Sequence, residues 1–536
     1  MTLRQLGALL TVIAVLGLGS TAHATARQFH TVLEDDELSL FSPPALPQFM
    51  ETLRWLGVDE LRISAEWKLE APSPYAAKPP IGADLGDPRT YDGSSAMRGL
   101  DRAVRAAARA GLGVIVDPAF SAPLWATSNR RPRKITGDPW FNTNIDVREL
   151  AQWEGMLAER YSGHYTPTGA SSPLPRVSTF TLWNEPNQVP FLEPQWRDGI
   201  PVSADWYRAM LRVAYPAIER ASPGTTVLIG NTSSTGGSAA VGNTGVPPLE
   251  FIRRLACVDA ALQPITTGSC ADFHTLPGDG WAQHPYERDA PPWVPSGPAD
   301  PDGAEMGDLP ALQALLNRLV AMHRFAPGVA TIWLTEQGYE SNGQLSDMPW
   351  TETQQADLNA VSEYLAWRDP QVASFSQFLL RDSLTSQTLA LRARTGDPQA
   401  FLSGTWTTGL ERENGAPKPA LAMFRSPVVA RILAPEAPLA SWLTSSPAGA
   451  PSGLIEVWGR VRPATTPTPV RIEVQDGGSD TFRTAASVLT DQNGIFDSDI
   501  AIAAGAPAEV RFQWSMAGAM QTSPTFTPIS FPVSGS

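Results

Sequence analysis

Short apolar runs alternate with segments of helical periodicity along residues 29–426. The clearest run, residues 112–117, is apolar at almost every position, which is typical of a strand buried on both faces of a parallel sheet. The preceding segment, 97–110, places apolar residues at helical spacing and stops at Gly111, a residue suited to the end of a helix. We predict strands over residues 29–33, 61–65, 112–117, 179–185, 226–230, 280–284, 330–335 and 372–380. We predict helices over residues 46–56, 97–110, 148–161, 204–220, 248–256, 309–323, 354–367 and 418–424.

Eight strand-helix alternations favour a (β/α)8 barrel over an open, doubly wound sheet. No glycine-rich phosphate fingerprint such as GxGxxG follows any of the runs, which removes the best reason for the open sheet. We therefore assign residues 25–430 to an α/β domain of TIM-barrel type.

The pattern changes beyond the barrel. Residues 431–453 are rich in proline, alanine and serine and are typical of a linker. Apolar and polar residues then alternate over 454–461, 470–474 and 510–514, with a turn at 491–494. This predicts a small antiparallel β domain over residues 454–536, with a sandwich as the expected form. Its role stays open between carbohydrate binding and a stabilising or spacing function.

The composition and charge of the chain exclude some classes of binding partner. The chain has 536 residues, of which 42% are hydrophobic, so it can bury a large core and its length suggests more than one domain. The formal net charge of -14 argues against nucleic acid or an anionic membrane as partner, and an acidic surface suits a neutral ligand. Oligomeric state is not indicated.

The first residues predict export. Arg4 precedes an apolar run over 6–18, and Ala22 and Ala24 stand where a signal peptidase site requires small residues. We predict a signal peptide over residues 1–24 and a secreted or extracytoplasmic protein. The alternative, a membrane anchor, needs a run of about 20 apolar residues, which is longer than this one. No later run is long and apolar enough to span a membrane, so we expect the mature chain to be soluble.

The two cysteines of the chain are Cys257 and Cys270. In an exported protein, a pair this close in sequence predicts a disulfide. A zinc site is not expected, because there are only two thiols and no adjoining histidine pattern. We predict no metal.

Two glutamates stand at the ends of predicted strands. Glu185 follows the run that starts at Thr179, and Glu336 follows the run 330–335. Because the loops after the strands build the active site of a barrel, both carboxyl groups are expected at its mouth. A solvated loop glutamate is the alternative for Glu185 taken alone.

A pair of converging carboxyl groups fits glycoside hydrolysis. One group must be protonated to assist the leaving oxygen, and the other must be ionised to attack the anomeric carbon. A retaining enzyme holds them roughly 5 to 5.5 Å apart, whereas an inverting enzyme separates them further.

The segments LWNEPN, at 182–187, and WLTEQG, at 333–338, resemble the motifs of glycoside hydrolase clan A, with a loop style similar to families 5 and 39. The resemblance covers residues 29–426 in layout. It implies that Glu185 is the acid/base and Glu336 the nucleophile, and that no cofactor is needed.

The resemblance also implies roles for neighbours of the pair. Asn184 would bind the sugar 2-hydroxyl, and Arg62 would keep the nucleophile ionised, although a structural salt bridge is its alternative. The segment QHPY, at 283–286, suggests that His284 lines the pocket and that Tyr286 donates a hydrogen bond to the nucleophile. A packed loop pair is the alternative for these two residues.

Tryptophans near strand ends are candidates for stacking on sugar rings. The candidates are Trp67, Trp125 and Trp281, and we expect Trp67 to bind substrate in this way. Core or loop packing is the alternative for each of the three taken singly. Clan members often carry a tryptophan after the eighth strand. None occurs in 375–382, and Trp406 from the following loop is the candidate replacement.

Together these features predict a secreted retaining glycoside hydrolase that cleaves O-glycosidic bonds of an oligosaccharide or polysaccharide. Two alternatives remain: a non-catalytic polysaccharide-binding protein on a barrel scaffold, and a transglycosylase that uses the same carboxylate pair. Sugar, linkage and internal or terminal cleavage are not indicated, because loop shape decides them.

Overall fold

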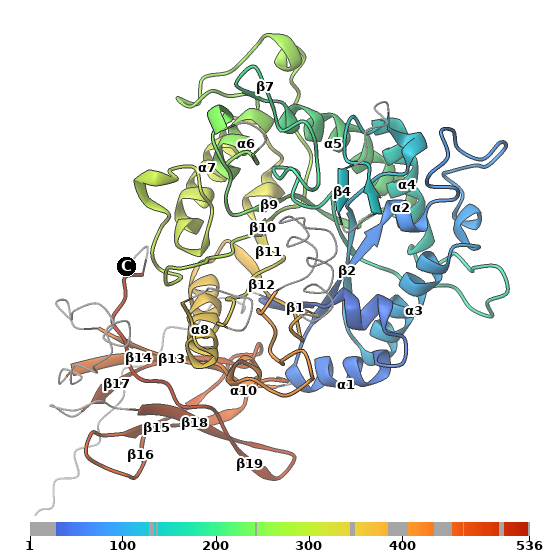
Figure 1. The fold of residues 1–536 in the computed structure, drawn as a ribbon. Helices are drawn as coiled ribbons and strands as arrows, with labels where there is room; N and C mark the ends of the chain where they lie inside the picture. Colours follow the sequence, from blue (N-terminus) through green and yellow to red (C-terminus); the bar gives the residue numbers. More distant parts are fainter. Residues whose placement is uncertain are drawn as a thin grey trace, which may run out of the picture.

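A computed structural model describes residues 28–127, 133–135, 138–241, 244–342, 349–383, 406–433, 453–464, 466–502 and 509–533. Eight parallel strands close into a barrel in the order β1-β2-β3-β6-β9-β10-β11-β12, with β12 paired to β1 (Figure 1). The strands are β1 (His30–Glu34), β2 (Glu60–Glu66), β3 (Gly113–Ala119), β6 (Thr179–Thr181), β9 (Thr226–Ser233), β10 (Gly280–His284), β11 (Ile332–Leu334) and β12 (Val372–Phe378). Each predicted strand matches one of them, which confirms the (β/α)8 barrel.

Helices surround the barrel as the periodicity predicts. They are α1 (Leu46–Leu56), α3 (Ser95–Ala110), α4 (Val147–Arg160), α5 (Val202–Ala221), α6 (Pro248–Leu255), α7 (Leu309–Ala321), α8 (Glu352–Arg368) and α10 (Pro419–Arg425). Helix α3 shows why the boundaries were predictable. The Ser94 side chain accepts a hydrogen bond from the backbone N–H of Met97 at its start, and Gly111 ends it with φ of 76°.

The chain bends sharply where it leaves β6. This strand is shorter than predicted, so Glu185 lies beyond it rather than at its last position. Trp183 and Glu185 have φ angles of 63° and 37°, a region uncommon for residues other than glycine. The bend is held by β9, because the Glu185 N–H donates to the carbonyl of Asn231 at 3.0 Å. Residues held in such conformations cluster at functional sites.

The C-terminal part forms two antiparallel sheets, as predicted. One contains β13 (Val428–Ile432), β14 (Gly453–Arg460) and β17 (Ile495–Ile502); the other contains β16 (Arg483–Leu489), β15 (Pro469–Gln475), β18 (Glu509–Met516) and β19 (Ala519–Thr522). Strand β13 pairs with β14 and therefore belongs to the C-terminal part. The C-terminal part thus begins before the predicted linker, which starts at residue 431. A sandwich arrangement of the sheets stays a prediction. Most of the linker, 434–452, and the predicted signal peptide lie outside the described residues.

The C-terminal sheets pack against the end of the barrel where the strands begin (Figure 1). Arg460 and Arg462 reach from the end of β14 to Glu363 of α8, with the Arg460 contact at 3.1 Å. Arg462 also donates to the Thr31 hydroxyl of β1 at 3.2 Å. A Cβ atom at Gly57 would stand 2.8 Å from Arg462 Cβ, so this junction leaves no room for a larger residue. Buried side chains of both parts belong to one continuous hydrophobic core.

Two further features bear on the predictions. A disulfide joins Cys257 and Cys270, as expected. Among the described residues, we find no helix with the length and apolar character that crossing a membrane requires.

Candidate active site

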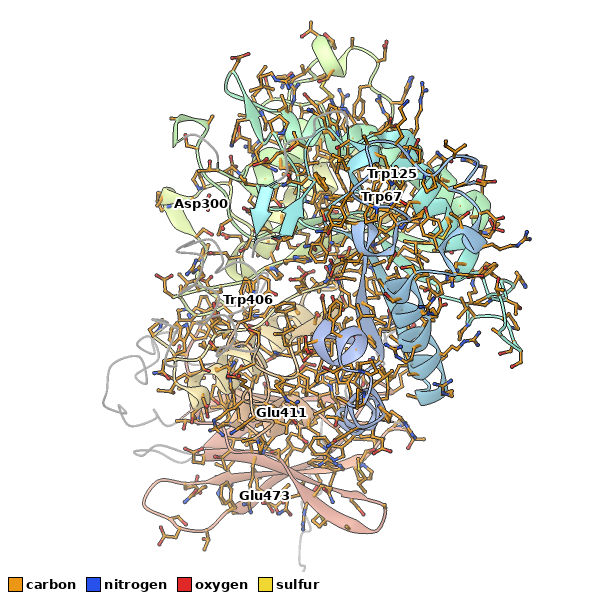
Figure 2. All side chains as sticks on the ribbon, turned by 45° about the vertical axis from the view of Figure 1, so that its right-hand side comes forward. Trp67, Trp125, Asp300, Trp406, Glu411 and Glu473 are labelled. Carbon is orange, nitrogen blue, oxygen red and sulfur yellow. A yellow bond between two sulfur atoms is a disulfide. The ribbon has the colours of Figure 1, made fainter. Side chains whose placement is uncertain are left out.

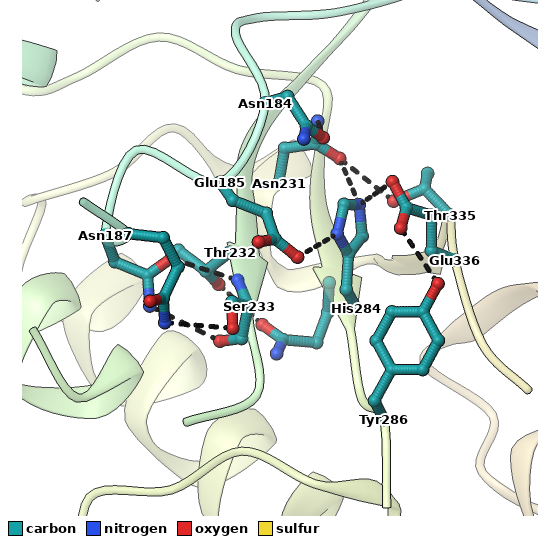
Figure 3. Close-up of polar contacts among 12 residues, drawn as sticks. Asn184, Glu185, Asn187, Asn231, Thr232, Ser233, His284, Tyr286, Thr335 and Glu336 are labelled. Atoms are coloured by element: carbon teal, nitrogen blue, oxygen red, sulfur yellow. Dashed lines mark hydrogen bonds and ion pairs between the residues drawn. The ribbon is translucent and has the colours of Figure 1, made fainter. Parts of the chain in front are cut away.

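Glu185 and Glu336 meet over the carboxyl ends of the barrel strands (Figure 3). One oxygen of each carboxyl group and one nitrogen of His284 all lie within 4.8 Å of one another. Glu185 comes from the bend after β6, Glu336 from the segment after β11, and His284 from the end of β10. Sequence separation of about 150 residues hides this proximity, and the closed barrel produces it.

Glu336 is placed to stay ionised. Arg62 Nη1 donates to its Oε1 at 2.8 Å, and the Tyr286 hydroxyl donates to its Oε2 at 2.9 Å. Burial raises the pKa of Glu336, while the charge of Arg62 and the hydrogen bond from Tyr286 act against that increase. Both oxygens therefore face a donor, which is what a carboxylate requires.

Arg62 is fully buried and bound from several strands. Its Nη2 donates to Asp117 Oδ2 of β3 at 2.7 Å and to Asn184 Oδ1 at 3.0 Å. Its Nη1 contacts Glu34 at the end of β1 as well as Glu336. The guanidinium group is thus held by partners on both sides, and its charge lies beside the candidate nucleophile.

Asn231 links the two halves of the site. Its amide nitrogen donates to Asp117 Oδ1 at 3.0 Å and to the Trp183 carbonyl at 2.9 Å. Its amide oxygen therefore points the other way, where Thr335 Oγ1 lies at 3.0 Å and His284 Nε2 at 2.9 Å. Because of this orientation of the amide, His284 Nε2 faces an acceptor, the amide oxygen of Asn231.

The surroundings of His284 assign its protons. Burial, with a contribution from the charge of Arg62, lowers the pKa of His284 well below its usual range, so the ring is neutral. Nε2 faces two oxygens, Asn231 Oδ1 at 2.9 Å and Glu336 Oε1 at 3.4 Å, and must carry the ring hydrogen. Nδ1 is then an acceptor.

A protonated Glu185 completes this pattern. Its Oε1 lies 2.9 Å from His284 Nδ1, and because that nitrogen only accepts, the proton belongs to the carboxyl group. Burial and the nearby charge of Glu336 raise the pKa of Glu185 well above its usual range, which agrees with this assignment. The hydrogen-bonding pattern therefore suits a protonated Glu185 beside an ionised Glu336.

The same groups are close enough to bind a cation. However, Nδ1 and Nε2 of His284 both take part in hydrogen bonds, and one of these bonds contains the proton of Glu185. The arrangement consequently suits proton transfer better than metal binding.

Trp67 corrects one expectation. Its side chain is fully buried, stacks on Trp153 with ring centroids 5.1 Å apart, and meets Trp125 edge-on at 6.0 Å. Figure 2 labels Trp67 and Trp125 in the same region of the barrel. No face of the ring is free for a sugar, so Trp67 is a core residue. Core packing also accounts for Trp281, which is 0% exposed.

Trp406 does reach the site. Its ring stacks on Tyr286 with centroids 5.4 Å apart and meets Phe378 edge-on at 5.6 Å. Trp406 therefore packs beside the residue that donates to Glu336, and its role as the replacement for the tryptophan of the clan stays a prediction.

Sequence reasoning missed four polar residues of this site: Glu34, Asp117, Asn231 and Thr335. Asp117 and Asn231 do carry a signal, since each is a polar residue near the end of an otherwise apolar run. The same rule that selected Glu185 applies to them.

Comparison with known proteins gives distant structural likenesses. No protein-family model matches the chain, and no curated protein sequence matches it. An endo-beta-1,4-mannanase from Thermotoga petrophila is similar at 12% identity and a TM-score of 0.37, over 94% of this chain and 98% of that one. Fpglu1 from Fervidobacterium pennivoraus is similar at 14% identity and a TM-score of 0.43, over 74% of this chain and 94% of that one. A GH5_18 protein from Bifidobacterium longum in complex with Manb1-4GlcNAc is similar at 15% identity and a TM-score of 0.41, over 75% of this chain and 77% of that one. Identities and TM-scores this low leave the geometry of the site as the basis for its function.

Proposed function

We propose that this chain is a secreted, retaining glycoside hydrolase of clan A that cleaves O-glycosidic bonds of an oligosaccharide or polysaccharide. The observation that carries the proposal is the unequal surroundings of the carboxyl pair: His284 Nδ1 lies 2.9 Å from Glu185 Oε1, whereas Arg62 and Tyr286 both donate to Glu336. Two chemically different carboxyl groups at one site are what acid assistance and nucleophilic attack require.

The separation of the two groups favours retention of configuration. Their nearest oxygens lie within 4.8 Å, close to the roughly 5 to 5.5 Å of retaining enzymes. An inverting enzyme needs about 6.5 to 9.5 Å to place a water molecule between carboxyl group and sugar.

The first step forms a glycosyl-enzyme ester. Glu336 attacks the anomeric carbon as the glycosidic bond breaks, and Glu185 gives its proton to the leaving oxygen. In the free protein that proton lies toward His284 Nδ1, and in the complex the leaving oxygen is the competing acceptor.

The second step reverses the roles. Glu185, now a carboxylate, takes a proton from water, the water oxygen attacks the anomeric carbon, and the ester to Glu336 breaks. The product keeps its configuration, and both glutamates return to their starting protonation states. A transglycosylase would differ only in using a sugar hydroxyl in place of water.

Kinetics of Glu185→Ala and Glu336→Ala test the assignment. A panel of 4-nitrophenyl and 2,4-dinitrophenyl glycosides of mono- and disaccharides would first identify a substrate for the wild type. Each variant should then lose about 10⁴-fold or more in kcat. Azide should restore turnover in Glu185→Ala and yield a glycosyl azide of retained configuration.

A matched control is Glu51→Ala, which removes an exposed carboxyl group on α1 and should behave as the wild type. Near-wild-type turnover in either active-site variant contradicts the assignment. A protein that binds glycans in calorimetry and cleaves none of the panel is the binding protein instead.

A further inference from the structure

Glu34 is a buried carboxyl group to which the proposed mechanism gives no task. It is the last residue of β1, and in the sheet it stands opposite Arg62 of β2 on one side and Phe378 of β12 on the other. Its side chain is only 5% exposed. This position lies on the floor of the site, between the arginine that serves the nucleophile and the aromatic group formed by Phe378, Tyr286 and Trp406.

Glu34 contacts the same atom as the nucleophile. Arg62 Nη1 donates to Glu34 Oε2 and, at 2.8 Å, to Glu336 Oε1. A sugar joined to Glu336 through its anomeric carbon must therefore lie close to Glu34. One nitrogen thus joins the two carboxyl groups.

Holding Arg62 accounts for only one of the two oxygens of Glu34, the one that accepts from the second N–H of Nη1. The guanidinium group already has Asp117 and Asn184 on Nη2 and Glu336 on Nη1. Burial and the charges of Glu336, Asp36 and Asp117 raise the pKa of Glu34 well above its usual range, while Arg62 opposes them. An additional buried carboxyl group is therefore costly at this position.

One oxygen of Glu34 is free. Oε2 is occupied by Arg62, while Oε1 has no hydrogen-bond partner among the residues that the structure describes. Among the described residues, the polar side-chain atoms that are both fully enclosed and without a partner do not include Oε1. Because Oε1 has no partner, it must therefore be accessible. A polar atom of this kind, beside a nucleophile, is available to a ligand.

We propose that Glu34 is a specificity-determining residue whose free oxygen, Oε1, forms a hydrogen bond with a hydroxyl group of the sugar that becomes attached to Glu336. This inference rests on the proposed function and deepens it. A hydroxyl group suits the position because it donates to a carboxylate, the form of Glu34 that the hydrogen bond from Arg62 favours, whereas the amide nitrogen of a glutamine cannot accept. The site then selects a neutral sugar with a free hydroxyl on the side of the ring that faces β1.

Monodeoxy substrates test this contact directly. The parent is the 4-nitrophenyl glycoside that the wild type cleaves fastest among the β-D-glucoside, mannoside, galactoside and xyloside and their disaccharide counterparts. Each analogue lacks one hydroxyl group of the sugar next to the nitrophenyl group. The measured quantity is kcat/KM for the wild type and Glu34→Gln on every member of the series.

Glu34→Gln should lower kcat/KM for the parent by about 10- to 100-fold, the range for a hydrogen bond that involves a charged group. For one analogue the two proteins should differ by less than about threefold, because the partner hydroxyl is already missing. The wild type alone should lose about 10- to 100-fold on that same analogue.

Asp117→Asn is the matched control. Asp117 is fully buried and holds both the other side of Arg62 and the amide of Asn231, so its change acts through these residues and not through a sugar hydroxyl, and it should lower kcat/KM by a similar factor across the whole series. A uniform loss with Glu34→Gln would mean that Glu34 acts only through Arg62, which overturns the inference and leaves the proposed function intact.

Two further results overturn the inference. One is wild-type kinetics of Glu34→Gln on the parent. The other is that the wild type cleaves every monodeoxy analogue as fast as the parent. This second result does not depend on whether any variant folds. A wild type that cleaves no glycoside fails at the first measurement and overturns the proposed function together with the inference.

Discussion

The hydrogen bond from Tyr286 to Glu336 gives the most quantitative prediction. Tyr286→Phe removes one hydroxyl and keeps the ring that packs on Trp406 and Phe378. The carboxylate then keeps Arg62 at 2.8 Å and loses its donor at 2.9 Å. A hydrogen bond to a charged group contributes about 1.5 to 3 kcal/mol. That amount stabilises the ionised form of Glu336 specifically, because the hydroxyl donates.

The same energy sets a shift in pH dependence. One pKa unit corresponds to about 1.36 kcal/mol, so losing the bond should raise the pKa of Glu336 by about 1 to 2 units. Attack requires the ionised form, so activity is lost as the pH falls through this pKa. The acid limb of the profile should therefore move to higher pH by that amount. Burial and neighbouring carboxylates hold the pKa of Tyr286 well above its usual range, so the hydroxyl remains a donor throughout.

The assay is kcat/KM for an aryl glycoside as a function of pH, which reports the free protein. Tyr339→Phe is the matched control, because it removes a buried hydroxyl bound to the Ala290 carbonyl at 3.0 Å, away from the carboxyl pair. It should leave the acid limb unchanged. An acid limb that is equally unchanged in Tyr286→Phe would refute the reasoning.

Other predictions concern the acid, the junction and the core. His284→Phe removes the nitrogen that accepts a hydrogen bond from protonated Glu185, so the pKa of Glu185 should fall. The alkaline limb of the kcat/KM profile should then move to lower pH. A move to higher pH would mean that His284 donates to Glu185 instead. Glu363→Ala removes the buried carboxyl group that both Arg460 and Arg462 contact and should lower the free energy of unfolding in urea by about 3 to 5 kcal/mol, whereas the exposed control Glu51→Ala should change it very little. Trp67→Ala should cost about 3 to 5 kcal/mol of stability while KM of the folded fraction stays the same, and a large rise in KM at unchanged stability would restore a role in substrate binding.

The architecture of the barrel was predictable because its strands and helices have clear local sequence patterns. Runs such as 112–117 are apolar at nearly every position, and helix α3 carries its own signals, Ser94 at the start and Gly111 at the end. The length of β6 was not predictable in this way. The run from 179 looks like a longer strand, but the chain turns into positive φ at Trp183, which only the contact with β9 explains.

The candidate site was predictable in part. Strand-end position located both glutamates, because the barrel brings strand ends together. Asn231 was missed because its importance comes from hydrogen bonds to both Asp117 and His284. The three residues lie on β3, β9 and β10, and their spacing in the sequence does not show that they are in contact.

Trp67 shows the opposite error. Its position after β2 fits a sugar platform, but packing on Trp153 of α4 turns the ring into the core. Whether an aromatic residue at a strand end faces a ligand or a helix is decided by tertiary packing, which a pattern along one segment does not contain.

Trapping of the glycosyl-enzyme ester tests the central claim most directly. A 2-deoxy-2-fluoro glycoside with a dinitrophenyl leaving group should inactivate the wild type with release of one equivalent of dinitrophenol. Peptide mass spectrometry should then find the fluorosugar on Glu336. A label on another residue, or turnover that releases a product of inverted configuration with no label, would contradict the account.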